Sequence, residues 1–506
     1  MFAETSPPMH TKKLLFSLLL LCSISNVLFA QPCKEVVGYY PNWQWYDRNQ
    51  LVKPTTLNYS KYSIINYCFF KPNPDGTIVS GDTWADDNLL LGPTIWYPVQ
   101  TNDFSNSIVG KAQAANVKVL ISVGGWSWSD EFPQIAANPA KRATFAGACR
   151  QLVSKYQLNG IDIDWEYPGY AGHSGTAADK HNYTVFLQQI RDSLTAYGQI
   201  TSKTYLLTAA VAASPANAAN IEWNNVSPIL DMINLMSYDF FGAWDPTSNH
   251  NSPLFAPAQG DPAFNLNSAF SMLTQTYNVP ANKINVGVAF YGRSVTGCTS
   301  LFGSTSGTAD TGTFSEDDGS PMYYNIVKNM SSFTRHWDNT AKVPYLLGNS
   351  IQTFVSYDDP ESIAEKAKFI NSKGARGAII WEITGDYIET SPGSGIIAHT
   401  PLVDTLNYIM CHNTPLGIES LANKNNTLSL YPNPSNGTVN ISYTSIANES
   451  ISMEIYNSIG ELVNQQKLIA DIGFNSFSIC VQQRGLFYIT IKGRQGMVTE
   501  KITITK

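Results

Sequence analysis

The sequence predicts an α/β protein: a (β/α)8 TIM barrel with a small inserted α+β domain, followed by a small all-β sandwich domain. Two observations predict the barrel, namely eight short apolar runs between Cys33 and Cys411 and the longer stretches of helical character that separate them. Parallel strands that alternate with helices form βα units, and eight such units close into a barrel whose active site faces the carboxyl ends of the strands. A chain of 506 residues is long enough for this domain and one smaller companion.

The eight runs have the apolar, β-branched and aromatic character of buried strands. More chain than one helix needs lies between the seventh run and the eighth, so we expect the inserted α+β lobe there, at about 294–357. In order along the chain, the predicted strands are VVGYY (36–40), YSIINYCFF (62–70), VKVLISVGG (117–125), LNGIDIDWE (158–166), TYLLTAAVAA (204–213), MINLMSYDF (232–240), INVGVAFYG (284–292) and GAIIWEI (377–383).

Residues 1–30 have the pattern of a secretory signal peptide. Lys12 and Lys13 precede an uncharged apolar run that ends near Ala30, and a polar segment follows it. This run is short for a membrane-spanning helix and no later segment resembles one, so we expect export through the periplasm, a secreted or cell-surface protein, and no membrane insertion. Cys22 within the run leaves lipid anchoring as the weaker alternative.

The composition excludes several classes of protein. Charged residues make up 14% of the chain and hydrophobic residues 43%, which fits neither a disordered chain nor a coiled coil. The net charge is −7 without any basic cluster, so no nucleic-acid partner is expected. Aromatic residues reach 12%, and they indicate either a large aromatic core or a carbohydrate-binding surface, because sugar rings stack on aromatic side chains.

Six of the seven cysteines lie beyond the signal peptide: Cys33, Cys68, Cys149, Cys298, Cys411 and Cys480. A bridge between Cys33 and Cys411 would join the two ends of the barrel domain in an oxidising compartment, but both thiols could equally stay free. No CxxC pair and no Cys/His cluster is present in the sequence, so we predict no structural metal and no cofactor.

The fourth run carries the strongest chemical signal, because Asp162, Asp164 and Glu166 are spaced by two and lie on one face of a strand. The apolar residues between them occupy the other face, where the outer helices pack. Like-charge repulsion and desolvation raise the pKa of at least one such acid and can keep it protonated near neutral pH. Glu166, nearest the mouth of the barrel, is the candidate general acid. A metal-binding or water-filled acidic cluster is the alternative that the spacing alone leaves open.

Several segments resemble, in the right order, the family 18 glycoside hydrolases, which are chitinases. The family pattern begins the acidic strand with an additional Asp where this chain has Asn159, on the opposite strand face from the acids, so we expect the difference to be tolerated. The segments that carry the resemblance are SVGGWSWS (122–129), DIDWE (162–166), MSYD (236–239), FYGR (290–293), WDNTAKVPY (337–345) and IIWEI (379–383).

The resemblance implies retaining hydrolysis of the β-1,4 linkages between N-acetylglucosamine units of chitin, in which the N-acetyl oxygen of the substrate attacks the anomeric carbon. By similarity, Glu166 protonates the leaving oxygen and then activates the water, while Asp164 orients the acetamido group. Asp162 exchanges a proton with Asp164. Tyr238 and Asp239 match residues that hold the acetamido carbonyl and tune the same network.

The resemblance also implies a set of substrate-binding residues. Trp381 matches the floor beneath the sugar that is cleaved, where stacking favours a distorted ring. Met236 faces inward beside Tyr238 on the sixth strand. Further positions line the sugar cleft in similar enzymes, with a packing role as the alternative for each, and these are Tyr39, Phe69, Trp126, Tyr167, Trp244, Tyr291 and Arg293.

After a polar linker at 412–427, segment 428–506 alternates apolar and polar residues between Gly and Asn turns, as in an antiparallel sandwich. Its LYPNPSNG (430–437), YNSIGELV and GLFYITIKG segments resemble the sorting domain of the type IX secretion system, which implies the outer-membrane translocon as a partner. A carbohydrate-binding module is the rival interpretation. The segment from Ser435 onward has no Trp and no row of aromatics, which favours sorting.

Two other functions compete with a chitinase. One is a catalytically weak chitin-binding lectin with the same fold, but such relatives replace the acid that this chain retains as Glu166. The other is an endo-β-N-acetylglucosaminidase that acts on N-glycans, which would share the acidic strand. The expected inserted lobe and the full aromatic set favour chitin.

Overall fold

The structure is a computed structural model that describes residues 34–411 and 428–505, apart from 446–447, 458–460, 472 and 494–495. The chain divides into two compact units between His412 and Asn413, and each has its own hydrophobic core. The predicted signal peptide, the predicted linker and Cys33 lie outside the described residues.

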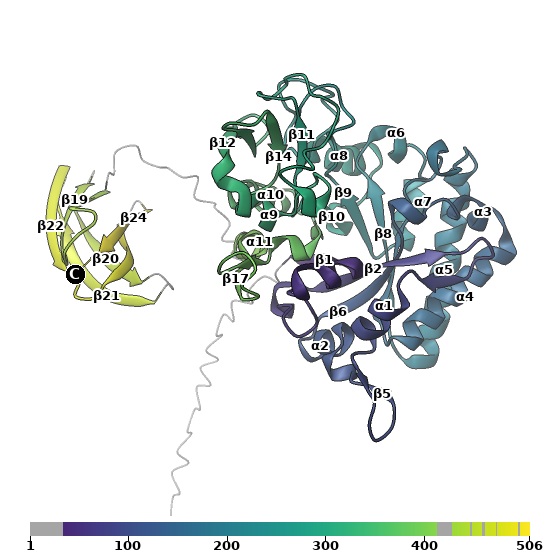
Figure 1. Ribbon diagram of the computed structural model, residues 1–506. Helices are drawn as coiled ribbons and strands as arrows, with labels where there is room; N and C mark the ends of the chain where they lie inside the picture. Colours follow the sequence, from purple (N-terminus) through teal and green to yellow (C-terminus); the bar gives the residue numbers. More distant parts are fainter. Residues whose placement is uncertain are drawn as a thin grey trace, which may run out of the picture. The chain divides into compact units, whose positions relative to one another are not determined.

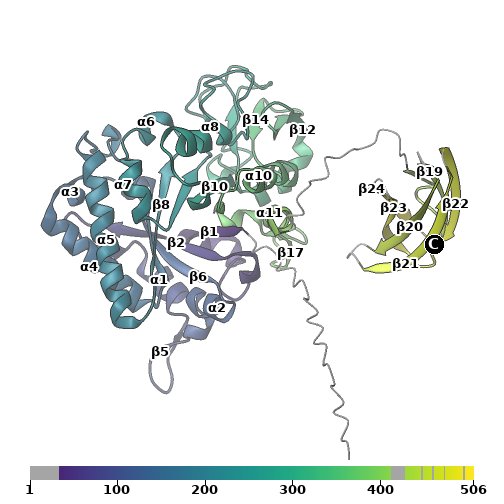
Figure 2. The same ribbon diagram turned by 180° about the vertical axis from the view of Figure 1, so that it is seen from behind.

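Eight parallel strands of the first unit form a closed barrel (Figures 1 and 2), which confirms the predicted fold class. Strand β1 closes it, because β1 pairs in parallel with both β2 and β15. A short strand, β3 (Ile78–Ser80), adds to β2 in the antiparallel sense. The barrel strands are β1 (Glu35–Pro41), β2 (Ile64–Pro72), β6 (Lys118–Gly124), β7 (Gly160–Asp164), β8 (Leu206–Ala212), β9 (Met232–Met236), β10 (Ile284–Ala289) and β15 (Gly377–Trp381).

Helices surround the barrel (Figure 1). Capping residues mark the start of several of these helices. Asn138 caps α4, whose first residue is Pro139, and Asp359 forms a capping box with Ser362 at the start of α10. The helices of this unit are α1 (Thr83–Leu90), α2 (Ile108–Ala114), α3 (Phe132–Ala137), α4 (Pro139–Lys155), α5 (Asp179–Thr201), α6 (Pro215–Ala218), α7 (Trp223–Ile229), α8 (Leu266–Ser271), α9 (Tyr323–Asn329), α10 (Pro360–Ser372) and α11 (Pro401–Cys411).

The two faces of β7 point in different directions, as its alternation predicts. Ile161, Ile163 and Trp165 belong to the core between barrel and helices, where the Trp165 ring stacks on Phe132 of α3 at 5.4 Å. The acids between them face the interior of the barrel. Burial of the apolar face therefore fixes the register of this strand and, with it, the direction of the acids.

The expected inserted α+β lobe follows β10. It contains helix α9 and an antiparallel sheet in the order β11-β14-β13-β12. Two small hairpins complete the unit, and the one formed by β4 and β5 stands out from the barrel beside α2 (Figure 1). The bounds are β11 (Arg293–Thr296), β12 (Phe333–Asp338), β13 (Val343–Gly348), β14 (Thr353–Ser356), β4 (Thr94–Ile95), β5 (Thr101–Asn102), β16 (Ile388–Glu389) and β17 (Ile397–His399).

The second unit is a sandwich of two antiparallel sheets, in the orders β18-β19-β22 and β21-β20-β23-β24, as the alternation in this segment predicts. Apolar residues from both sheets form its core. The strands are β18 (Leu428–Tyr431), β19 (Thr438–Ser445), β20 (Glu449–Asn457), β21 (Leu462–Ala470), β22 (Gly473–Cys480), β23 (Gly485–Gly493) and β24 (Gly496–Ile504).

Cys411 is disulfide-bonded, whereas the thiols of Cys68, Cys149, Cys298 and Cys480 are free. Cys33, the partner considered for Cys411, lies outside the described residues, so this pairing stays a prediction. Within the described ranges, none of the helices has the length and apolar character needed to cross a membrane.

A buried ion pair joins α10 to the end of the inserted lobe. Lys366 and Asp358 are both fully buried, with 2.6 Å between Nζ and Oδ2, and the Ser252 hydroxyl donates to the same carboxylate. Burial lowers the pKa of Lys366, while the Asp358 charge raises it. We expect Lys366→Met to lower the free energy of unfolding of the barrel by about 3 kcal/mol, because it leaves Asp358 buried without its partner.

Urea unfolding followed by tryptophan fluorescence measures this loss, since all 11 Trp lie in the first unit. The matched control is Lys368→Met, which removes an exposed lysine from the same helix. We expect the control to change the free energy by less than about 1 kcal/mol. An equally small loss for Lys366→Met would contradict the prediction.

Candidate active site

Asp162 lies at the centre of a hydrogen-bond network inside the barrel. Its carboxylate accepts from Tyr39 Oη at 2.9 Å, Ser122 Oγ at 2.8 Å, Asn234 Nδ2 at 3.1 Å and the Thr208 hydroxyl. Burial raises the pKa of Asp162, and these hydrogen bonds oppose the rise. With four donors around its two oxygens, Asp162 is held in a fixed orientation.

Asp164, the last residue of β7, has a different environment. It is 3% exposed, and its Oδ1 atom has no hydrogen-bond partner among the residues that the structure describes. Burial, followed by the nearby charges of Glu166 and Asp162, raises the pKa of Asp164 well above its usual range. The carboxyl group of Asp164 therefore has an oxygen available to a ligand or to a proton.

Glu166 lies two residues beyond β7 and is partly buried. Its backbone is fixed on both sides, because its N–H donates to Ser129 Oγ at 2.9 Å and its carbonyl accepts from His173 Nδ1 at 2.6 Å. Burial raises the pKa of Glu166 to about 7, opposed by a hydrogen bond from Tyr167 and one from the Trp126 backbone N–H. A carboxyl group with this pKa can both donate and accept a proton near neutral pH.

Asp239 follows β9 and pairs with a second charged side chain, Arg293, at the barrel mouth. Its backbone is left-handed (φ 58°), and its N–H donates to Asn251 Oδ1 at 3.0 Å. The carboxylate accepts from Tyr291 Oη at 2.6 Å and from Arg293 Nε at 2.8 Å. The guanidinium group of Arg293 lies 5.1 Å from the centre of the Trp244 ring. The inserted lobe thus contributes Arg293, the first residue of β11, to the site.

Trp381, the last residue of β15, belongs to an aromatic cluster at the same end of the barrel. Phe69 stacks on its ring at 5.8 Å, and Tyr39 lies 5.8 Å away in a tilted arrangement. Trp43, in the first loop beyond β1, contacts both Trp381 at 6.4 Å and Phe69 at 6.1 Å. This cluster provides a flat apolar surface beside the acids, of the kind on which a sugar ring stacks.

The structure brings most of the predicted site residues together. Trp126 and Trp244 border the site from exposed positions, 54% and 59% exposed, and Tyr167 is half-buried next to Glu166. One cluster inside the barrel contains, or has packed against it, the predicted residues Tyr39, Phe69, Tyr238, Tyr291, Met236 and Trp381.

The partners of Asp162 on the neighbouring strands were not predicted from the sequence. Ser122 on β6 and Thr208 on β8 both pair in register with Asp162, so their inward direction follows from strand alternation. Asn251 and His173 lie on loops, and no periodic pattern indicates that they reach the site. For Trp43, the sequence provided only a weak indication that it reaches the site, namely its position just after the first predicted strand.

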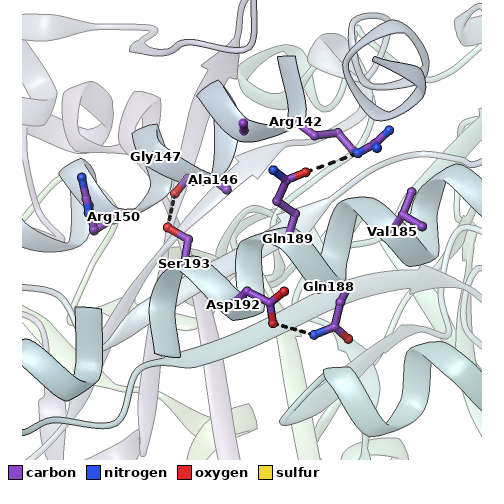
Figure 3. Close-up of a pocket in the computed structure, with 10 residues that line it drawn as sticks. Arg142, Ala146, Gly147, Arg150, Val185, Gln188, Gln189, Asp192 and Ser193 are labelled. Atoms are coloured by element: carbon purple, nitrogen blue, oxygen red, sulfur yellow. Dashed lines mark hydrogen bonds between the residues drawn. The ribbon is translucent and has the colours of Figure 1, made fainter. Parts of the chain in front are cut away.

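A surface pocket of about 580 Å3 lies on the outside of the barrel between α4 and α5 (Figure 3). Its polar side chains bond to near neighbours: Gln188 Nε2 donates to Asp192 Oδ1 at 2.8 Å, and Ser193 Oγ donates to the Ala146 carbonyl at 2.9 Å (Figure 3). None of the predicted site residues lines this pocket. The candidate active site is therefore the barrel mouth, where the acids and aromatics meet.

Comparison with known families agrees with this geometry. The family Glycosyl hydrolases family 18 matches residues 35–386, and the family Secretion system C-terminal sorting domain matches residues 429–505. The chain belongs to glycosyl hydrolase family 18. Its second unit is a secretion sorting domain, which confirms both the predicted resemblance and the expected secretion to the medium or the cell surface.

The chain is similar to Chitinase A1 of Niallia circulans, with 38% identity over 435 residues that cover 75% of this chain and 62% of the relative. The chain thus spans less than two thirds of that relative. It is 34% identical to Endochitinase 1 of Metarhizium robertsii over 360 residues, 69% of this chain and 80% of the relative. Among solved structures, Chitinase ChiA74 from Bacillus thuringiensis has a TM-score of 0.66 and 29% identity, and the match covers 93% of this chain and 85% of that one. The predicted enzyme class, a glycoside hydrolase of the chitinase type, is confirmed.

Proposed function

We propose that this protein is a secreted chitinase that hydrolyses β-1,4 linkages between N-acetylglucosamine units by a retaining, substrate-assisted mechanism. One observation carries the proposal: the three acids lie in a row from the barrel interior to its mouth, and each has a different environment. In order, they are Asp162, Asp164 and Glu166. Asp162 is held by four donors, Asp164 has an unpartnered oxygen, and the pKa of Glu166 lies at about 7.

In the first step, protonated Glu166 donates its proton to the glycosidic oxygen. The acetamido oxygen of the same sugar attacks the anomeric carbon, the bond to the leaving sugar breaks, and an oxazolinium ion forms. Asp164 accepts a hydrogen bond from the acetamido N–H and stabilises the developing positive charge. In this role Asp164 is a carboxylate, and in the proposed mechanism Asp162 exchanges a proton with it.

In the second step, Glu166 is a carboxylate and takes a proton from a water molecule, which attacks the anomeric carbon. The bond from that carbon to the acetamido oxygen breaks as the water adds, and the acetamido group re-forms. Water arrives on the face that the leaving group vacated, so the product keeps the β configuration. Trp381 forms the floor under the distorted sugar. The Tyr238 hydroxyl donates to the acetamido carbonyl, and Asp239 tunes the same network. The remaining proposed substrate-binding residues are Met236, Tyr39, Phe69, Trp126, Tyr167, Trp244, Tyr291 and Arg293.

The domain organisation that fits this function has a signal peptide at 1–30 and a catalytic domain at 31–411 with its inserted lobe at about 294–357. A linker at 412–427 follows, and then the sorting domain at 428–506. In this proposal the partners are chitin or its oligosaccharides at the barrel mouth, and the type IX translocon at the sorting domain. No step of the proposed mechanism requires a cofactor.

The direct test incubates the purified protein with the hexamer of N-acetylglucosamine and, in parallel, with a high-mannose glycopeptide. We expect shorter oligomers from the hexamer and an intact glycopeptide. Binding of the hexamer without cleavage would support the lectin alternative, and cleavage of the glycopeptide alone would support an N-glycan endoglycosidase.

The pKa of Glu166 sets the expected pH dependence. The first step needs the protonated form, so kcat/KM is predicted to fall as the pH rises through about 7, approaching tenfold per pH unit above it. Initial rates with the hexamer between pH 4 and pH 10 measure this limb, and tryptophan fluorescence at each pH checks that the fold persists. A rate that stays level up to about pH 9 would contradict the assignment of Glu166.

A further inference from the structure

Two asparagine side chains lie next to each other inside the barrel, beside Asp162. Asn234 of β9 and Asn285 of β10 are both fully buried, and they pair in register on neighbouring strands. Asn285 Nδ2 donates to Asn234 Oδ1 at 3.0 Å, and Asn234 Nδ2 donates to Asp162 Oδ1 at 3.1 Å. The two amides therefore form a chain of hydrogen bonds that ends on the Asp162 carboxylate.

The direction of the Asn234 amide follows from its neighbours. Tyr39 Oη donates its single proton to Asp162 Oδ2 at 2.9 Å, so this oxygen can only accept from Asn234 Nδ2, which lies 3.2 Å away. On the other side of the amide, Asn285 supplies the donor for Asn234 Oδ1. The Asn234 NH2 group therefore faces Asp162 and Tyr39, and its oxygen faces β10.

Asn234 differs in one respect from the other partners of Asp162. The hydroxyl groups of Tyr39, Ser122 and Thr208 can turn, so each can donate to a carboxylate or accept from a carboxylic acid. An NH2 group can only donate. As long as its amide is held in this direction, Asn234 favours the ionised form of Asp162.

Asp164 is the other carboxyl group that can hold the proton. It follows Asp162 on the same face of β7, and its Oδ1 atom has no hydrogen-bond partner among the residues that the structure describes. Burial raises the pKa of Asp164, and the charges of Glu166 and Asp162 raise it further. A preference for ionised Asp162 therefore leaves the proton on Asp164 in the free enzyme.

We propose that Asn285 is a positioning residue that holds the Asn234 amide in one direction, so that the proton exchanged between the two aspartates stays on Asp164 until substrate binds. The inference rests on the proposed function, because it concerns the acids of that reaction. Without the Asn285 donor, the Asn234 amide can turn over and accept from a protonated Asp162. The single proton of the pair then lies on Asp162, and the negative charge lies on Asp164.

This change of charge acts on Glu166. Glu166 and Asp164 interact directly, since the Glu166 charge raises the pKa of Asp164, whereas Asp162 lies deeper in the barrel. Moving the negative charge from Asp162 to Asp164 therefore raises the pKa of Glu166 above its value of about 7. Because the first step needs protonated Glu166, the limb on which kcat/KM falls then moves to higher pH.

The other titratable groups around the three acids are the same in the wild type and in variants of Asn285. Burial raises the pKa of the tyrosines and of the cysteine among them, so these stay neutral near pH 7. The groups are Tyr39, Cys68, Tyr167, His173, Tyr183, Tyr238 and the ion pair of Asp239 with Arg293.

The test replaces Asn285 with leucine, which has a similar size and no donor. Values of kcat/KM for the hexamer are measured between pH 4 and pH 10, and we expect the falling limb to move up by about 0.5 to 1 pH unit. Asn285→Ala removes the donor without placing a methyl group against Asn234, and it is expected to move the limb in the same direction. Tryptophan fluorescence checks that each variant is folded.

A double-mutant cycle separates this role from a purely structural one. In an Asn234→Leu background Asn285 has no amide to hold, so adding Asn285→Leu is expected to move the limb by less than about 0.2 pH unit. The matched control is Asn371→Leu on α10, which is expected to keep the limb of the wild type. Like Asn285, Asn371 donates one hydrogen bond at 3.0 Å, to the Ile409 carbonyl, and its Oδ1 has no partner in the described part of the chain.

The failures of the two proposals are distinguishable. If the wild type does not cleave the hexamer, the proposed function is wrong. If the wild type cleaves it and both Asn285 variants keep the limb of the wild type, or move it to lower pH, the role of Asn285 is overturned. A shift of equal size with and without the Asn234 amide would also overturn it, because Asn285 would then act by another route.

Discussion

Replacing Glu166 with glutamine is expected to lower kcat at least about 10³-fold, because the amide can neither protonate the leaving oxygen nor take a proton from water. Binding of the hexamer is expected to persist, since glutamine keeps the size of the side chain and its contacts with Tyr167 and the Trp126 backbone. Initial rates measure the first effect, and titration calorimetry with the hexamer measures the second.

Glu382 provides a matched control for this experiment. It also follows a barrel strand, and burial raises its pKa to about 7 as well. Its carboxylate, however, accepts from the N–H and hydroxyl of Thr384 and caps a short helical turn. We expect Glu382→Gln to change kcat by less than about tenfold. A Glu166→Gln variant with a rate near that of the wild type would overturn the assignment of the general acid.

The second large effect is expected at Asp164. Asp164→Asn removes the carboxylate that orients the acetamido group and stabilises its charge, so kcat is predicted to fall about 10²- to 10³-fold. Asp86→Asn is the control, because Asp86 is also buried with a raised pKa. Its carboxylate accepts hydrogen bonds from Tyr67, Asn42 and Ser80, away from the three acids of the site. Kinetics of Asp164→Asn that match the wild type would remove the substrate-assisted mechanism.

Strand β7 shows which features of the site could be predicted from residue patterns alone. The spacing of Asp162, Asp164 and Glu166 predicts one inward face, and the structure has this arrangement because the opposite face packs against α3. The order of their environments did not follow from the spacing, since it depends on donors from β1, β6, β8 and β9. Such contacts join residues far apart in the chain and have no periodic signal.

The geometry of the site residues on loops could be predicted less well from the sequence than that of the residues on strands. Asp239 reaches Tyr291 and Arg293 from a left-handed backbone that Asn251 holds, and none of this geometry follows from hydrophobic alternation. Tyr291 and Arg293 entered the predicted site through the family resemblance. His173 had no such guide, and its link to Glu166 emerges only from the three-dimensional contacts.

In the proposed mechanism, the acetamido oxygen of the substrate acts as the nucleophile and the anomeric configuration is retained. Proton NMR of the purified protein acting on N-acetylglucosamine oligomers tests it most directly, with spectra recorded before the released ends mutarotate. The mechanism predicts β-anomer as the first product. Initial release of the α-anomer would contradict it.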